Sequence, residues 1–126
     1  MMDNSQLAGI VQSGPGGLPF VTLVAADGAR AVVCLHGAHV TSWVPAGEDG
    51  DRLFLSSRSE FRAGTALRGG VPISFPQFAT QGPLPKHGFA RLTTWELVSA
   101  EGGGSEAVAF LRLTDSAETR AIWPHA

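Results

Sequence analysis

The sequence has 126 residues, of which 44% are hydrophobic, and a formal net charge of −2 from nine Lys and Arg against eleven Asp and Glu. This length suits one domain and is too short for two, so residues 1–126 are expected to form a single domain. The near-neutral charge argues against a nucleic-acid-binding protein, which would carry a strongly basic face. No apolar run reaches the length of a membrane span, and residues 1–12 lack the charged and apolar regions of a signal peptide. The single cysteine, Cys34, has no internal disulfide partner, which favours a reducing compartment. Taken together, these features lead us to expect a cytoplasmic protein without nucleic-acid or membrane partners.

Short apolar runs separated by turn residues occupy most of the chain, a pattern typical of β-strands in an antiparallel meander. Asp27-Gly28 is a hairpin signal, and Pro45 cannot donate to a ladder, so it ends the run before it. The predicted strands occupy residues 20–26, 30–35, 38–44, 53–55, 93–99 and 107–114. Only residues 57–64 and 116–120 are compatible with a helix, and each is too short to be stable without tertiary support. The pattern predicts an all-β fold, an antiparallel β-sandwich.

No acidic residue lies between Glu60 and Glu96, although the chain as a whole is slightly acidic. Four bases lie in this window, namely Arg62, Arg68, Lys86 and Arg91. A local surplus of positive charge favours an anionic ligand. Two simpler explanations remain open: four surface bases gathered by chance, or the arginines form ordinary ion pairs with the two flanking glutamates.

The stretch Arg-Gly-Gly-Val-Pro-Ile-Ser-Phe-Pro-Gln-Phe at 68–78 fits neither a regular strand nor an ordinary surface loop. Its two glycines allow backbone angles and close approaches that a side chain would forbid, and its two prolines remove ladder donors. Two further prolines stiffen the loop at 79–86, and a rigid rim loses little entropy when a ligand binds. Arg68 and Arg91 can offer planar forks of N–H donors to phosphate oxygens, and Lys86 a point charge. We therefore expect these three cations to converge on an anion.

Residues 68–78 and the sequence Lys-His-Gly-Phe-Ala-Arg at 86–91 together resemble the glucose-6-phosphate 1-epimerase family, the hexose-6-phosphate mutarotases, which belong with the aldose 1-epimerases. Leu-His-Gly-Ala-His-Val-Thr-Ser-Trp at 35–43 is similar to the family's early Gly-Ala strand pair, and residues 115–124 are similar to its mid-domain region. The resemblance implies a large galactose-mutarotase-like β-sandwich, of which this chain would be an incomplete N-terminal part. It also implies an isomerase of carbohydrate metabolism that interconverts the α and β anomers of glucose 6-phosphate and related sugar phosphates.

The same resemblance assigns substrate binding to Arg68 and Arg91, with the 6-phosphate of the sugar as their partner. Lys86 stands where similar proteins carry an amide, and a cation there would strengthen phosphate binding. His87 is a candidate general acid or base, a donor to a sugar hydroxyl, or a structural residue, and we favour the last two roles. The family's catalytic histidine and glutamate are expected after Ala126, so we expect this chain to hold no catalytic residue and to bind substrate without converting it. Mutarotation is acid–base chemistry and needs no metal or cofactor.

Cys34, His36 and His39 lie close together in the sequence, as metal ligands often do. Alternation along a strand would direct His39 away from the other two unless Gly37 breaks the strand, and no fourth ligand is evident. We therefore expect no metal site.

The alternative function is that of a non-catalytic sugar-phosphate or carbohydrate-binding protein. Part of a sandwich would in either case expose strand edges and apolar surface. The chain is therefore expected to self-associate through those edges.

Overall fold

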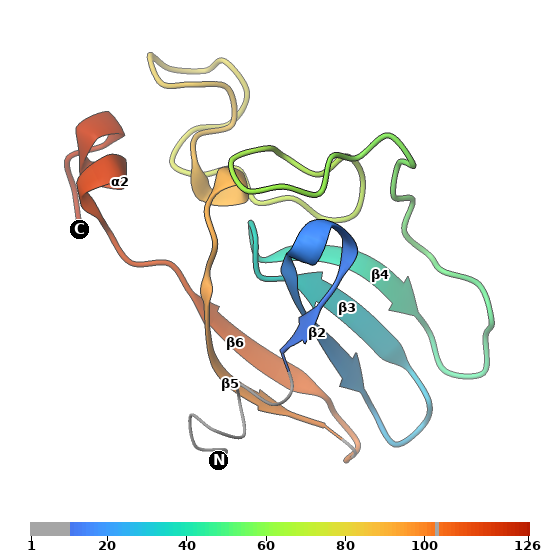
Figure 1. The fold of residues 1–126 in the computed structure, drawn as a ribbon. Coiled ribbons are helices and arrows are strands. Elements are labelled where there is room, and N and C mark those ends of the chain that lie inside the picture. Colours follow the sequence, from blue (N-terminus) through green and yellow to red (C-terminus); the bar gives the residue numbers. More distant parts are fainter. Residues whose placement is uncertain (1–10, 103) are drawn as a thin grey trace.

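The computed structural model describes residues 11–102 and 104–126 of the chain. Its strands are β1 (Gln12–Ser13), β2 (Pro19–Val24), β3 (Arg30–Cys34), β4 (His39–Val44), β5 (Glu96–Glu101) and β6 (Val108–Arg112). The short helices within these residues are the 3-10 turns η1 (Pro15–Gly17) and η2 (Ala90–Leu92) and the α-helix α2 (Ala117–Ile122). Every strand pair is antiparallel, in a four-stranded sheet of order β1-β2-β3-β4 and a two-stranded sheet of β5 and β6. The predicted all-β antiparallel fold is confirmed, and Figure 1 shows the long connection from β4 to β5 beyond one end of the strands.

The first core cluster lies between the two sheets and is built from alternate residues of β2 and β3. Val21 and Val33 are register partners, so their side chains share one face of the four-stranded sheet. Leu97 and Ala100 of β5 pack against them, together with Leu35, and all five side chains are buried. Each fully buried Val or Leu contributes about 1.5–3 kcal/mol. This packing joins the two sheets as the layers of a sandwich.

The second core cluster covers the opposite face of the four-stranded sheet. Phe20 and Cys34 are register partners there, and they pack with Leu18 and Leu67. Cys34 is completely buried, so its side chain packs within this cluster, and burial raises the pKa of its thiol. Because Leu67 belongs to this cluster, the residue immediately before Arg68 is fixed onto the sheet.

The segment that follows β4 differs from its prediction. Residues 53–55 form only an isolated bridge to Gly69 and no strand, and residues 57–64 form turns and bends without a helix. The backbone hydrogen bonds explain this difference, since the N–H of Ser56 donates to the carbonyl of Arg68 (2.8 Å). The segment is therefore anchored to the chain around Arg68, and its conformation is set by that contact.

β5 begins at Glu96, later than predicted, because the residues before it have a different partner. The N–H of Trp95 donates to the carbonyl of Leu35 (2.8 Å), and Thr94 forms an isolated bridge with His36. These bonds attach the start of the predicted strand to the turn between β3 and β4.

Helix α2 lies close to the predicted helix-compatible residues 116–120 and begins at a capping box. The hydroxyl of Ser116 accepts from the N–H of Thr119 (3.2 Å), and the hydroxyl of Thr119 accepts from the N–H of Ser116 (2.8 Å). Thr119 is also buried, which supplies the tertiary support that so short a helix requires.

Within the described residues, no helix is both long enough and apolar enough to cross a membrane.

Candidate functional site

Arg68, Lys86 and Arg91 line one pocket of about 780 Å³, formed by the connection between β4 and β5. The other residues of its lining are Ser56, Arg58, Glu60, Thr65, Ala66 and Leu67. A pocket of this volume lies within the range of small-molecule sites. The structure thus brings together the three cations that the sequence predicts to converge, from two separate segments of the loop region drawn in green and yellow in Figure 1.

Ion pairing divides the bases of the chain into two groups. In the described part of the chain, four of the nine Lys and Arg pair with carboxylates: Arg52 with Glu48, Arg62 with Glu60, Arg112 with Glu96, and Arg120 with Asp115. The glutamates that flank the acid-free window are therefore occupied by arginines outside the predicted site, and the ordinary ion-pair explanation for Arg68 and Arg91 is wrong. Within residues 11–102 and 104–126, four of the five other bases line this pocket. Its surplus positive charge favours an anionic ligand.

The Nε of the Arg91 guanidinium is buried without a partner among the described residues. The Nη2 of the same side chain donates to the carbonyl of Lys86 (3.2 Å). A buried, unsatisfied donor costs about 1–3 kcal/mol, and more when it is charged. The backbone of Arg91 is fixed by close contact with Gly37, where an added Cβ would lie 2.8 Å from the Arg91 carbonyl oxygen. This contact holds the backbone of Arg91 at the pocket that the residue lines.

Arg68 lies on a segment that two buried histidines hold at both ends. The Nε2 of His36 lies 2.7 Å from the carbonyl oxygen of Thr65, and the Nε2 of His39 lies 2.5 Å from that of Gly69. Because a carbonyl only accepts, both imidazoles donate through Nε2. These anchors were not predicted, since each joins residues about 30 positions apart in the chain.

The geometry of these histidines also corrects the strand argument used against a metal site. That argument placed His39 opposite His36 unless Gly37 breaks the strand, and in the structure both rings reach the segment 65–69. Gly37 and Ala38 take φ angles of 82° and 46°, so the strand is broken between the two histidines. In the described residues, each Nε2 is engaged by a backbone carbonyl and each Nδ1 has no partner.

Gly69 and Gly70 make the close backbone approaches that the sequence predicts. Their φ angles are 106° and 60°. A Cβ on Gly69 would lie 2.2 Å from the carbonyl oxygen of Phe54, and one on Gly70 would lie 2.3 Å from that of Val40. The double glycine therefore lets the chain that carries Arg68 cross directly over two neighbouring backbone segments.

His87 stabilises the loop on the other side of the pocket. Its Nδ1 accepts from the N–H of Ala79 (3.0 Å) and lies 3.2 Å from the hydroxyl oxygen of Ser74. Desolvation first, and then the charges of Arg91 and Lys86, lower the pKa of His87. The imidazole is therefore neutral at pH 7 and carries its proton on Nε2, an arrangement that suits a structural residue or a hydrogen-bond donor.

Gln77 holds the loop between residues 79 and 85 from inside. The side chain is buried, and its Nε2 donates to the carbonyls of Ala79 (2.8 Å) and Leu84 (3.1 Å) while its Oε1 accepts from the N–H of Leu84 (2.9 Å). The sequence predicts a stiff loop here because of its prolines. The buried amide of Gln77 adds three hydrogen bonds to the residues just before Lys86.

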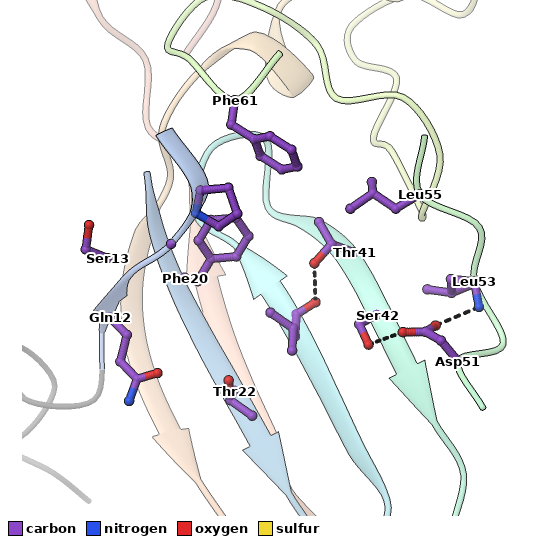
Figure 2. A pocket seen from close by; sticks show the side chains of 13 residues that line it. Gln12, Ser13, Phe20, Thr22, Thr41, Ser42, Asp51, Leu53, Leu55 and Phe61 are labelled. Carbon is purple, nitrogen blue, oxygen red and sulfur yellow. Dashed lines mark hydrogen bonds between the residues drawn. The ribbon is translucent and has the colours of Figure 1, made fainter. Parts of the chain in front are cut away.

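A second pocket, of about 510 Å³, lies over β2, β3 and β4 (Figure 2). Its one acidic lining residue, Asp51, accepts hydrogen bonds from the hydroxyl of Ser42 and from the N–H groups of Leu53 (2.8 Å) and Trp43 (3.1 Å). These bonds, that of Ser42 foremost, lower the pKa of Asp51. No Lys or Arg lines this pocket among the described residues, so it does not match an anionic ligand.

The lowered pKa of His39 leads us to expect that the stability of the fold decreases in mild acid. Burial first, and then the nearby His36, lower the pKa of His39 against the opposing effect of its bond to the Gly69 carbonyl. The unfolded chain takes up a proton near pH 6.5, whereas the folded chain resists it, so the free energy of unfolding should decrease as the pH falls below about 6.5.

Urea unfolding at pH 7.5 and 5.5 measures this effect. The variant His39→Gln keeps an N–H donor for Gly69 but does not titrate, so its stability should change less between the two pH values. His125→Gln, at an exposed position, serves as the control. Equal pH dependence in His39→Gln and the parent chain would contradict the assignment.

The family model described as aldose 1-epimerase matches residues 19–126. An Escherichia coli (strain K12) protein named "Putative glucose-6-phosphate 1-epimerase" is 45% identical over 98 residues, which cover 76% of this chain and 33% of that protein. A Cenchrus ciliaris protein of the same name is 39% identical over 117 residues, covering 88% of this chain and 35% of that protein. The chain thus spans about a third of the length of these relatives.

The fold also matches a solved structure. A crystal structure described as that of a putative mutarotase (YeaD) from Salmonella typhimurium superposes with a TM-score of 0.75 at 32% identity. The match covers 96% of this chain and 44% of that one. The same backbone arrangement therefore occurs in a protein described as a mutarotase.

Proposed function

The chain belongs to the aldose 1-epimerase family, and we propose that it forms the sugar-phosphate-binding part of a hexose-6-phosphate 1-epimerase. Such an enzyme interconverts the α and β anomers of glucose 6-phosphate and related sugar phosphates. The observation that carries the proposal is the pocket in which Arg68, Lys86 and Arg91 meet without a carboxylate paired to any of them in the described part of the chain. The names of the curated relatives support the choice of substrate.

The phosphate of a hexose 6-phosphate suits this pocket because it carries a charge of about −1.5 to −2 at pH 7 and three strong acceptor oxygens. Arg68 and Arg91 can each present a planar fork to it, and Lys86 adds a mobile point charge. Arg91 is half-buried, so its charge is screened less by solvent than the charges of the exposed Arg68 and Lys86. Binding of a neutral sugar would leave these charges unsatisfied.

We propose that the catalytic acid and base come from the part of the family fold that this chain does not span, and that residues 1–126 correspond to its N-terminal portion. Mutarotation requires one group to protonate the ring oxygen and another to take the proton of the anomeric hydroxyl. His87 is neutral at pH 7 and its Nδ1 holds the loop, while Glu60 and Glu96 are bound to arginines. No acid–base pair is assembled from these residues.

Exchange NMR between the anomers of glucose 6-phosphate, with free glucose as the control, tests the proposal on this chain. We expect saturable binding of glucose 6-phosphate, no measurable binding of glucose, and an exchange rate equal to that in buffer. Accelerated exchange would show that the chain has its own acid and base. Equal binding of the two sugars would overturn the phosphate site.

We also propose that the chain self-associates through strand edges and acts in the cytoplasm. In the described residues β5 and β6 pair only with each other, and Phe110 of β6 is 63% exposed. The buried, unpaired Cys34 fits a reducing compartment. Sedimentation velocity should detect a dimer or larger species, and a stable monomer at all concentrations would contradict the association.

A further inference from the structure

Arg58 lines the same pocket as the three predicted cations, although it lies outside the acid-free window of the sequence. It sits on a tight turn in which its N–H donates to the hydroxyl of Ser56 (3.1 Å) and the N–H of Ser59 donates to the carbonyl of Ser56 (3.1 Å). Both serines therefore fix the backbone from which the Arg58 side chain extends.

This turn is bound directly to the backbone of Arg68. The N–H of Ser56 donates to the Arg68 carbonyl (2.8 Å), the hydroxyl of Ser59 donates to the same carbonyl (3.2 Å), and the N–H of Arg68 donates to the hydroxyl oxygen of Ser59 (3.0 Å). Three hydrogen bonds thus join the two chain segments that carry Arg58 and Arg68. The two arginines are presented to the pocket by one connected unit.

The charges around Arg58 leave it available for a ligand. Glu60 is the one acidic residue of the pocket lining in the described chain, and its carboxylate is bound to Arg62 (2.8 Å). Arg62 is further held by a hydrogen bond from its Nε to the hydroxyl of Thr65 (3.0 Å). Arg58 forms no ion pair with a carboxylate among residues 11–102 and 104–126.

We propose that Arg58 is a fourth phosphate-binding side chain and a specificity-determining residue, which makes the pocket favour a doubly charged phosphate ester over a singly charged one. This inference rests on the proposed function, to which it adds a residue and a basis for discrimination. Coulomb attraction scales with the charge of the ligand, so each added cation strengthens the binding of a dianion more than that of a monoanion. Charge-assisted hydrogen bonds to phosphate oxygens add to this preference.

Calorimetric titration with glucose 6-phosphate, a dianion, and glucose 6-sulfate, a monoanion of similar shape, tests the proposal at low ionic strength. Because Arg58 is exposed, Arg58→Ala should weaken binding of the phosphate by about fivefold. Its effect on the sulfate should be smaller, and Arg58→Lys should restore most of the loss. The control Arg52→Ala removes the same charge from an arginine that is paired with Glu48 outside the pocket, and it should change neither affinity by more than about twofold.

The outcomes separate this proposal from the proposed function. If Arg91→Ala abolishes phosphate binding while Arg58→Ala binds both esters like the parent chain, the role of Arg58 is overturned and the phosphate site stands. An equal loss of phosphate and sulfate binding in Arg58→Ala would overturn the discrimination. If neither Arg91→Ala nor Arg58→Ala changes binding, the phosphate site is overturned as well. Thermal unfolding of each variant establishes that it is folded before titration.

Discussion

Replacing Arg91 with alanine is expected to weaken the binding of glucose 6-phosphate by roughly 10- to 100-fold, because charge-assisted hydrogen bonds of about 1.5–3 kcal/mol are lost. Arg91 should have the largest effect among the cations of the pocket, since it is half-buried whereas the other three are exposed, and a partly buried charge is screened less by solvent. Isothermal titration calorimetry measures the change.

The Arg91 substitution should not unfold the chain, which makes the loss of binding interpretable. Alanine removes the buried, unpartnered Nε together with the one hydrogen bond from Nη2 to the Lys86 carbonyl, so the free energy of unfolding should change by no more than about 1 kcal/mol. Arg91→Lys keeps the charge but loses the planar fork, so it should bind with intermediate affinity. Arg112→Ala, a charge removed on β6 from an arginine paired with Glu96, is the matched control. Parent-like affinity in Arg91→Ala would contradict the site.

Replacing Gly69 with alanine is expected to lower the free energy of unfolding by about 3 kcal/mol or more, because backbone strain and a steric clash add together. The φ angle of Gly69 is 106°, and a Cβ would lie 2.2 Å from the carbonyl oxygen of Phe54. That carbonyl belongs to the backbone and cannot rotate away like a flexible side chain. Urea unfolding measures the loss, and phosphate binding should weaken in parallel because Arg68 is the adjacent residue.

Gly64→Ala separates the two causes of that loss. Gly64 also has a positive φ angle, 77°, but a Cβ there would meet no atom within 4 Å. Its replacement should therefore cost only the left-handed conformation, about 1–2 kcal/mol. Equal destabilisation by the two substitutions would show that the close approach at Gly69 contributes nothing.

The strands of the four-stranded sheet were predictable because their signals are local. The alternation of residues 20–26 and 30–35, the Asp-Gly turn between them and the proline after 38–44 predicted β2, β3 and β4 to within a few residues. The start of β5 was predicted too early, since Thr94 and Trp95 bond to the turn between β3 and β4. Propensity identifies an extended segment but cannot tell which partner it will pair with.

Three cations of the candidate site were predictable from the sequence, whereas the hydrogen bonds that hold their backbones in place were not. Arg68, Lys86 and Arg91 stood out from the acid-free window and the family motifs, and they line one pocket in the structure. Arg58 lies outside the acid-free window because that window begins after Glu60. The sequence does not show that the carboxylate of Glu60 is paired with Arg62, as it is in the structure. Counting charges along the sequence therefore gave fewer cations for the site than the number that line the pocket in the structure.

The amino-acid sequence was sufficient to identify the cations proposed to bind an anion and the glycines that allow close backbone contacts, because charge and allowed φ angles belong to individual residues. The tertiary structure alone decided how those cations are held. His36 and His39 bond to carbonyls about 30 residues away, and Gly37 lies against Arg91, so the turn between β3 and β4 and the first residue of β4 together support both walls of the pocket. Hydrogen bonds between distant backbone groups leave no local pattern, since almost any residue can supply the carbonyl that a buried imidazole needs.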